Sequence, residues 1–188
     1  AHLLGLAGPR FVASDALKRC STVLGQLGRE AWHYYLCEGV CTDVILRLEQ
    51  LGNEAQNKKS VAEAQELRHE AQAWQERRDN MRQEQEQHRG RTQKLQKLVE
   101  LVLELHEELQ EECRCIIFVE QICVAAPIAN VLNRELGKSL ATHASGGANM
   151  SESARRLNMD KFRSGRCHIL VATAAMEEGI DVGDCNIV

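Results

Sequence analysis

Two apolar runs in the second half of the chain constrain the fold most. They are Cys115–Val119 (CIIFV) and His168–Ala172 (HILVA), and both are rich in β-branched or bulky apolar residues. Runs of this kind are typical of strands that are buried on both faces of a parallel sheet. Helical patterns over 124–136 and 151–162 lie between them and surround a short strand signal at 140–143. This alternation predicts right-handed crossovers and a parallel α/β sheet.

The first half of the chain has a pattern that predicts helices instead. Its apolar residues recur at helical spacing over 10–51, more thinly over 54–92, and cleanly from Leu95 to Leu109. Lysines begin the last of these helices and glutamates end it, which is the reverse of the order that the helix dipole favours. We therefore expect packing, not capping, to stabilise this helix.

The change of pattern near residue 91 predicts two parts. We expect an all-helical part over 1–91 and an α/β lobe over 92–188, since 188 residues allow one domain or one and part of a second. Residue 1 is not Met, and Asn186–Val188 begins a strand pattern with no turn after it. A buried strand seldom ends a domain with its ladder unfinished, so the sequence predicts a piece of a longer protein.

Composition excludes several classes of protein. Hydrophobic residues make up 44% and charged residues 27% of the chain, which argues against a wholly disordered protein. The apolar runs, of about five residues, are too short to span a bilayer, so no membrane partner is expected. A net charge of −4 excludes a globally basic nucleic-acid binder, although it allows a local basic groove.

The eight cysteines favour an intracellular protein, cytoplasmic or nuclear. Reduced thiols are the preferred interpretation because no signal peptide and no compact cysteine framework are present. No pair has the C-x-x-C spacing of a structural zinc knuckle, so no metal site is predicted. We expect these cysteines to serve mainly as small buried apolar residues.

The segment Ile169–Val182 carries the most chemical information. Thr173 ends the second apolar run, and ligands of open parallel sheets bind at the carboxyl ends of strands. Its hydroxyl and the following backbone amides have the chemistry to hold a phosphate oxygen. Gly179 would allow close approach of the backbone to a ligand, and Asp181 would accept hydrogen bonds from a ribose.

Two sets of charged residues have two interpretations each. The first is a solvated surface, which is the commoner role of such residues. The second is acid–base chemistry for Glu177 and Glu178, and nucleic-acid binding for Arg77, Arg78, Arg82, Arg89 and Arg91.

Three motifs resemble a known family. IIFVE at 116–120, FRSG at 162–165 and ILVATAAMEEGIDVGDCNIV at 169–188 occur in the order seen in the second RecA-like domain of superfamily-two helicases. IIFVE, and EEGID followed by a CNIV-type strand, resemble the Dicer branch in particular. The resemblance implies a parallel-sheet RecA-like lobe of the P-loop type, truncated here, preceded by an all-helical insert.

The resemblance also implies roles for individual residues. One departure from the family pattern is Ala174–Met176, a small apolar stretch where relatives often carry serine. Phe118, Val119, Glu120 and Thr173 match the RNA path, Gly179 and Asp181 match positions that face the nucleotide, and Phe162 and Gly165 match a supporting F-x-x-G motif.

The sequence lacks the groups that perform phosphoryl transfer in this family. It has no G-x-x-x-x-G-K-[ST] loop, no Asp-Glu pair after a buried strand, and no Q-x-x-G-R-x-R motif. No catalytic residue is therefore assigned, and the chain alone is predicted to be inactive. ATP and Mg²⁺ would be held in the intact protein, mainly by the first helicase lobe.

The resemblance thus implies the second lobe of an ATP-dependent double-stranded-RNA helicase or translocase. It would belong to a Dicer-like ribonuclease III that processes small RNAs, with double-stranded RNA and the protein's own first lobe as partners. Two alternatives stay open. One is a related RNA-sensor or DNA-repair helicase, and the other is a degenerate lobe that serves as a protein-interaction scaffold, with the helices of 54–112 as its docking surface.

Overall fold

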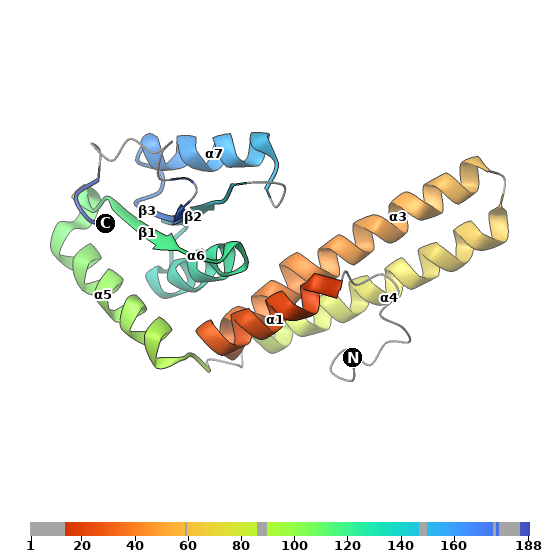
Figure 1. Ribbon diagram of the computed structural model, residues 1–188, viewed down its shortest axis with the longest axis horizontal. Coiled ribbons are helices and arrows are strands. Elements are labelled where there is room, and N and C mark those ends of the chain that lie inside the picture. The colour runs from red at the N-terminus through yellow and green to blue at the C-terminus, as the bar shows by residue number, and fades with distance from the viewer. Residues whose placement is uncertain (1–13, 59, 86–89, 147–149, 175, 177–184) are drawn as a thin grey trace. The chain divides into compact units, whose positions relative to one another are not determined.

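The computed structural model describes residues 14–58, 60–85, 90–146, 150–174, 176 and 185–188 (Figure 1). Helices dominate the first half and strands alternate with helices in the second. The elements are α1 (Ser14–Leu27), α2 (Arg29–Tyr34), the π-helix η2 (Tyr35–Cys41), α3 (Thr42–Asn57), α4 (Val61–Gln85), α5 (Gln93–Leu109), the 3₁₀-helix η3 (Gln110–Glu112), β1 (Cys115–Val119), α6 (Ile122–Leu136), β2 (Ala141–Ala144), α7 (Glu152–Arg163) and β3 (Ile169–Thr173).

The chain folds into two compact units. The helical unit comprises Ala1–Ser21 and Trp32–Arg89, and the sheet unit comprises Thr22–Ala31 and Gly90–Val188. The chain therefore passes from one unit to the other three times. The end of α1 and the start of α2 pack with the sheet unit, although they lie far upstream of it in the sequence. The domain division predicted at residue 91 stays a prediction.

The helical unit is built around the pair α3 and α4, which run antiparallel (Figure 1). Val44 and Leu48 of α3 are buried against Ala71 and Trp74 of α4. Each large apolar side chain removed from water stabilises the pair by about 1.5–3 kcal/mol. The thin apolar stripe of residues 54–92 is thus sufficient for a helix that packs on one side only.

The π-helix η2 brings two cysteines into the core of the helical unit. Cys37 and Cys41 are both 0% exposed, and the Thr42 hydroxyl donates to the Cys37 carbonyl at 3.1 Å. Burial raises the pKa of Cys37 to about 12 and that of Cys41 to about 11. Six of the eight cysteines are buried, which confirms the expected role of most of them as small apolar residues.

The sheet unit confirms the predicted parallel α/β sheet. Among the described residues, three strands lie in the order β1-β3-β2, and both strand pairs are parallel. α7 covers one face of the sheet and α6 the other (Figure 1). Ile187 forms an isolated parallel bridge with Cys115, so the strand predicted at 186–188 begins beside β1, on the side away from β3.

The central position of β3 explains its composition. All five of its residues, Ile169–Thr173, are buried, because strands flank it on both edges and helices cover both faces. Leu170 and Ala172 pack with Ile116 of β1 and with Phe162 of α7 in one cluster. A fully apolar run is the sequence signature of such a strand.

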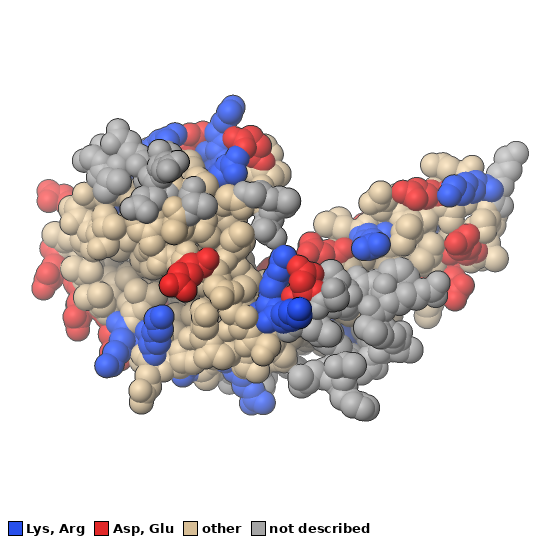
Figure 2. Space-filling model, viewed as in Figure 1, with Lys and Arg blue, Asp and Glu red and all other residues tan. Residues whose placement is uncertain are grey.

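Helix α5 has an N-cap that the sequence analysis did not anticipate. The Thr92 hydroxyl accepts a hydrogen bond from the Leu95 amide at 3.3 Å and donates one to the Gln26 carbonyl at 2.7 Å. Packing through Leu95 and Val99 contributes as well. The expectation that caps play no part was therefore wrong. The reversed charge order is real, and acidic side chains gather along one stretch of α5 at the left edge of Figure 2.

Candidate functional site at the carboxyl edge of the sheet

The carboxyl ends of the three parallel strands meet at one edge of the sheet. In the register of β1 and β3, Val119 is paired with Thr173. Ala144, the last residue of β2, is paired with Ala172. The structure thus brings together two residues that sequence reasoning had assigned to the RNA path, 54 positions apart. This edge is where open α/β sheets bind ligands.

Thr173 makes its contact to the loop that follows β2. It is 3% exposed, and its hydroxyl oxygen accepts a hydrogen bond from the Gly146 amide at 3.4 Å. The hydroxyl is the acceptor in this bond, so its proton is available in principle for donation to an anionic oxygen. The sequence carried no signal that connects Gly146 with Thr173.

The three predicted RNA-path residues at the end of β1 differ in exposure. Phe118 is half-buried and packs against the core cluster that contains Ile116 and Phe162. Val119 is also half-buried, while Glu120 is exposed just beyond the strand. Of the three, Glu120 presents the most surface to a ligand, and the assignment of all three to RNA stays a prediction.

The predicted nucleotide-facing residues, Gly179 and Asp181, lie outside the described residues. The same holds for Glu177 and Glu178. Their assignments stay predictions. The segment that carries them follows β3 directly, and the described chain resumes at Cys185.

The F-x-x-G motif lies at the end of α7. Phe162 is 4% exposed and belongs to the core that packs against the sheet. Gly165 has φ +76°, a conformation that L side chains rarely adopt. These two positions explain why the motif needs an aromatic residue and a glycine three residues apart.

Arg114 holds this motif and was missed by sequence reasoning. Its Nη1 donates to the carbonyls of Phe162 at 2.7 Å and Cys167 at 3.3 Å, and its Nη2 donates to the Arg163 carbonyl at 3.3 Å. The guanidinium also lies 5.6 Å from the centroid of the Phe162 ring. An arginine next to a strand resembles an ordinary flanking charge, and its acceptors are backbone carbonyls, so the sequence carried no signal for this role.

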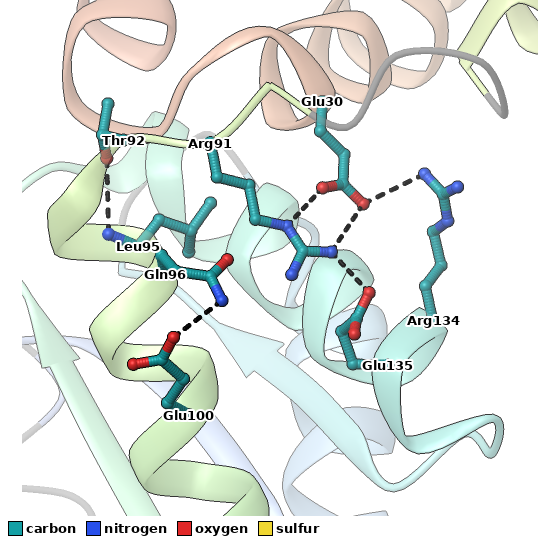
Figure 3. A network of polar contacts seen from close by, with 8 residues as sticks. All are labelled: Glu30, Arg91, Thr92, Leu95, Gln96, Glu100, Arg134 and Glu135. Atoms are coloured by element: carbon teal, nitrogen blue, oxygen red, sulfur yellow. Dashed lines mark hydrogen bonds and ion pairs between the residues drawn. The ribbon is translucent and has the colours of Figure 1, made fainter.

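A buried ionic network connects three segments of the sheet unit (Figure 3). Arg91 pairs with both Glu30 oxygens, at 2.5 and 3.2 Å, and with Glu135 at 2.5 Å. Arg134 is 3.2 Å from Glu30. The side chains of Glu30 and Arg91 are only 1% and 8% exposed. The network therefore fixes the start of α2 and the start of α5 against the end of α6.

This network corrects the nucleic-acid interpretation of Arg91. The Arg91 guanidinium is 8% exposed and is bound to two carboxylates, so it is an internal ion-pair partner and not a surface group for nucleic acid, and that interpretation was wrong for this residue. Arg82 pairs with Glu38 at 2.7 Å on the surface, which favours the solvated interpretation there. Arg89 lies outside the described residues.

Two further findings concern metals and membranes. Among the described residues, no three His, Cys, Asp or Glu side chains come together as a set that would hold a metal ion. In the same part of the chain, no helix combines the length and apolarity needed to cross a bilayer.

Comparison with known proteins gives consistent matches to one family. The model of the helicase conserved C-terminal domain matches residues 93–188. Endoribonuclease Dicer homolog 4 of Oryza sativa is 40% identical over 86 residues, which is 43% of this chain and 5% of that protein. Endoribonuclease Dicer homolog 1 of the same plant is 36% identical over 102 residues, or 52% of this chain and 5% of that protein. Dicer-like protein 1 of Phaeosphaeria nodorum is 32% identical over 93 residues, 46% of this chain and 6% of that protein.

Among solved structures, the Hef helicase domain of Pyrococcus furiosus is similar, with a TM-score of 0.43 and 21% identity over 78% of this chain and 29% of that one. The matched region spans about a twentieth of the length of the curated relatives named above. The region matched by the family model, residues 93–188, coincides with the sheet unit from α5 onward and contains all three motifs. Because the family model covers half of its residues, this chain belongs to the helicase conserved C-terminal domain family, and the curated relatives named above, to which it is similar, are Dicer homologues.

Proposed function

We propose that this chain supplies the second helicase lobe of an intracellular, Dicer-like protein that uses ATP to translocate on or unwind double-stranded RNA during small-RNA processing. The family match over residues 93–188 is the observation that carries the proposal. The similarity to plant and fungal Dicer homologues supports the Dicer-like part. In this proposal the lobe acts by closing on a first lobe of the same protein.

Double-stranded RNA would contact the carboxyl edge of the sheet. The Thr173 hydroxyl, which is the acceptor in its bond with Gly146, would donate its proton to a phosphate oxygen, and its partner in the register, Val119, lies beside it. Glu120 is exposed at the same edge, where a carboxylate accepts hydrogen bonds from ribose hydroxyls but repels phosphate. Such contacts recognise the shape and backbone of A-form RNA and not its sequence.

ATP and Mg²⁺ would be held mainly by the first lobe. The described residues of this chain supply no set of three metal-binding side chains, and Gly179 and Asp181 lie outside them. In this proposal the chain contributes to the ATP site only by closing it from one side, through Gly179 and Asp181. Phosphoryl transfer depends chiefly on positioning and on electrostatic stabilisation of charge, and two lobes in contact provide both.

The test is the ATPase activity of the full-length protein with and without double-stranded RNA. We expect RNA to stimulate ATP turnover. In the Thr173→Val variant the RNA-stimulated rate should be about tenfold lower, because one hydrogen bond to a charged group is lost. Thr142→Val is the matched control, since Thr142 is a threonine of β2, 7% exposed and away from the carboxyl edge. Asp181→Ala tests the nucleotide side.

The alternatives predict other outcomes. Turnover that RNA stimulates, in a protein without paired ribonuclease III domains, would favour an RNA sensor or a repair helicase. A complete absence of ATPase activity would favour a degenerate lobe that acts as a scaffold. Stimulated turnover that Thr173→Val leaves unchanged would refute the assignment of this edge to RNA.

A further inference from the structure

The backbone and the side chain of Arg114 bind two different segments of the sheet unit. The side chain donates three hydrogen bonds to the turn that ends α7, as described above. The backbone binds Asn186: the Arg114 amide donates to Asn186 Oδ1 at 2.8 Å, and the Asn186 amide donates to the Arg114 carbonyl at 3.1 Å. The Ile187 amide donates to the same carbonyl at 3.2 Å. One residue thus joins the F-x-x-G turn to the segment 185–188, downstream of β3.

The guanidinium donates to backbone carbonyls at the carboxyl end of α7 and just beyond it. The last carbonyls of an α-helix have no intrahelical donor, and a cation near them interacts favourably with the helix dipole. Arg114 reaches two of these carbonyls, those of Phe162 and Arg163, and adds the Cys167 carbonyl. Its nitrogens lie 3.6 Å from the position that a Cβ of Gly165 would take. The turn therefore follows the outline of the guanidinium closely.

The side chain of Asn186 is also held by two hydrogen bonds. Its side-chain amide donates to the Glu112 carbonyl at 2.7 Å while its oxygen accepts from Arg114. Immediately beyond it, Ile187 accepts from the Ile116 amide at 3.0 Å. These bonds define where the chain re-enters the sheet beside β1. A displacement of the Arg114 backbone would therefore displace Asn186 as well.

We propose that Arg114 is a positioning residue that couples the F-x-x-G turn to Asn186, and so fixes the point at which the chain re-enters the sheet beside β1. The link to nucleotide binding rests on the proposed function, because the residues assigned there to the nucleotide precede Asn186 in the sequence. A residue that merely capped α7 would stabilise the turn alone. Coupling requires that a change at either contact be detected at the other.

Amide hydrogen exchange, measured by NMR on the 188-residue chain, tests the coupling directly. The reporters on the α7 side are the amides of Gly165 and Cys167, which donate to Phe162 and Lys161. On the other side, the reporters are the amides of Asn186 and Ile187. We expect Arg114→Met to speed exchange of the second pair about tenfold, and Asn186→Ala to speed exchange of the first pair by a similar factor. In the double variant that combines Arg114→Met with Asn186→Ala, the reporter amides should exchange no faster than in whichever single variant shows the faster exchange, because the effects of coupled contacts are not additive.

A matched control separates coupling from general destabilisation. Asn133 makes two hydrogen bonds to Ala141, at 2.7 and 2.9 Å, and holds α6 to β2. In the Asn133→Ala variant, the exchange rates of both reporter pairs should stay unchanged relative to those of the other slowly exchanging amides. If each variant affects only its own contact, or if all reporters respond equally in all variants, the coupling is refuted. Arg114→Lys, which keeps the charge but loses the planar fork, gives an intermediate effect and serves if Arg114→Met does not fold.

A second readout addresses the role in nucleotide binding. In the full-length protein, Arg114→Met should raise KM for ATP several-fold more than it lowers kcat, whereas Asn133→Ala should not. A fall in kcat with unchanged KM would overturn the positioning role. Absence of RNA-stimulated turnover in the wild type would overturn the proposed function, while the exchange measurements decide the coupling independently.

Discussion

Arg91 binds both carboxylate oxygens of Glu30 across 61 positions of sequence, at 2.5 and 3.2 Å, in a site where the Glu30 side chain is 1% exposed. Removing Arg91 leaves the buried Glu30 carboxylate with Arg134, at 3.2 Å, as the one remaining cation that the described contacts give it. We expect Arg91→Met to lower the free energy of unfolding by about 3–5 kcal/mol. Urea denaturation followed by circular dichroism measures this directly.

Arg82 provides the control for that substitution. It pairs with Glu38 at 2.7 Å, but both side chains are more than one-third exposed. Water screens an exposed pair, so Arg82→Met should cost less than about 1 kcal/mol. Equal costs for the two arginines would show that burial of the Glu30 network contributes nothing to stability.

The two glycines near the end of α1 should respond in opposite directions to the same substitution. Gly28 has φ +95°, and a Cβ there would overlap the carbonyl oxygen of Gly90 and crowd the backbone of Arg91. Gly25 lies inside α1 with nothing near its Cβ position. Gly28→Ala should therefore destabilise the sheet unit by about 1–3 kcal/mol or more, whereas Gly25→Ala should stabilise it by about 0.5–1 kcal/mol.

Thermal unfolding of the two alanine variants, run side by side, tests this pair. The melting temperature should fall for Gly28→Ala and rise for Gly25→Ala. A rise for both variants would mean that the chain at Gly28 relaxes to accept a side chain, and that the close approach to Gly90 is not required.

The sheet was predictable because each strand shows its burial in its own composition. The run at 169–173 is apolar because β3 is central and covered on both faces, and that information is local. The position of Thr173 at the carboxyl edge follows from the strand alone. The hydrogen bond from Gly146 does not follow, because it depends on the order of the strands.

The ionic network and the role of Arg114 were not predictable for a related reason. Glu30 and Arg91 are separated by 61 positions, and Arg114 and its acceptor Phe162 by 48. In the second case the acceptors are backbone carbonyls, which every residue type supplies. A charged residue with distant partners has the same local sequence as one that faces water, so Arg91 was wrongly considered for nucleic acid.

Two substitutions at the N-cap of α5 distinguish the contribution of the Thr92 hydroxyl to stability from that of its methyl group. Thr92 accepts from the Leu95 amide and donates to the Gln26 carbonyl. Thr92→Val keeps the shape but loses both bonds, and should lower the free energy of unfolding by about 1–2 kcal/mol. Thr92→Ser keeps the hydroxyl, so it should lower the free energy of unfolding by only a few tenths of the amount lost in Thr92→Val. If the two variants are equally stable, packing alone holds the start of α5, as the charge order had suggested.

His143 gives the protein a dependence on pH in the mildly acidic range. It lies on β2, and burial lowers the pKa of its imidazole below the ordinary 6.5. Below pH 6.5 the unfolded chain binds a proton that the folded chain does not, so stability falls as pH falls, by at most about 1.4 kcal/mol per pH unit from this group. Urea unfolding at about pH 7.5 and about pH 5 should show a smaller loss in His143→Gln than in the wild type. His69→Gln is the control, since His69 is exposed on α4. An equal loss of stability in the wild type and in both variants would assign the pH dependence to other groups.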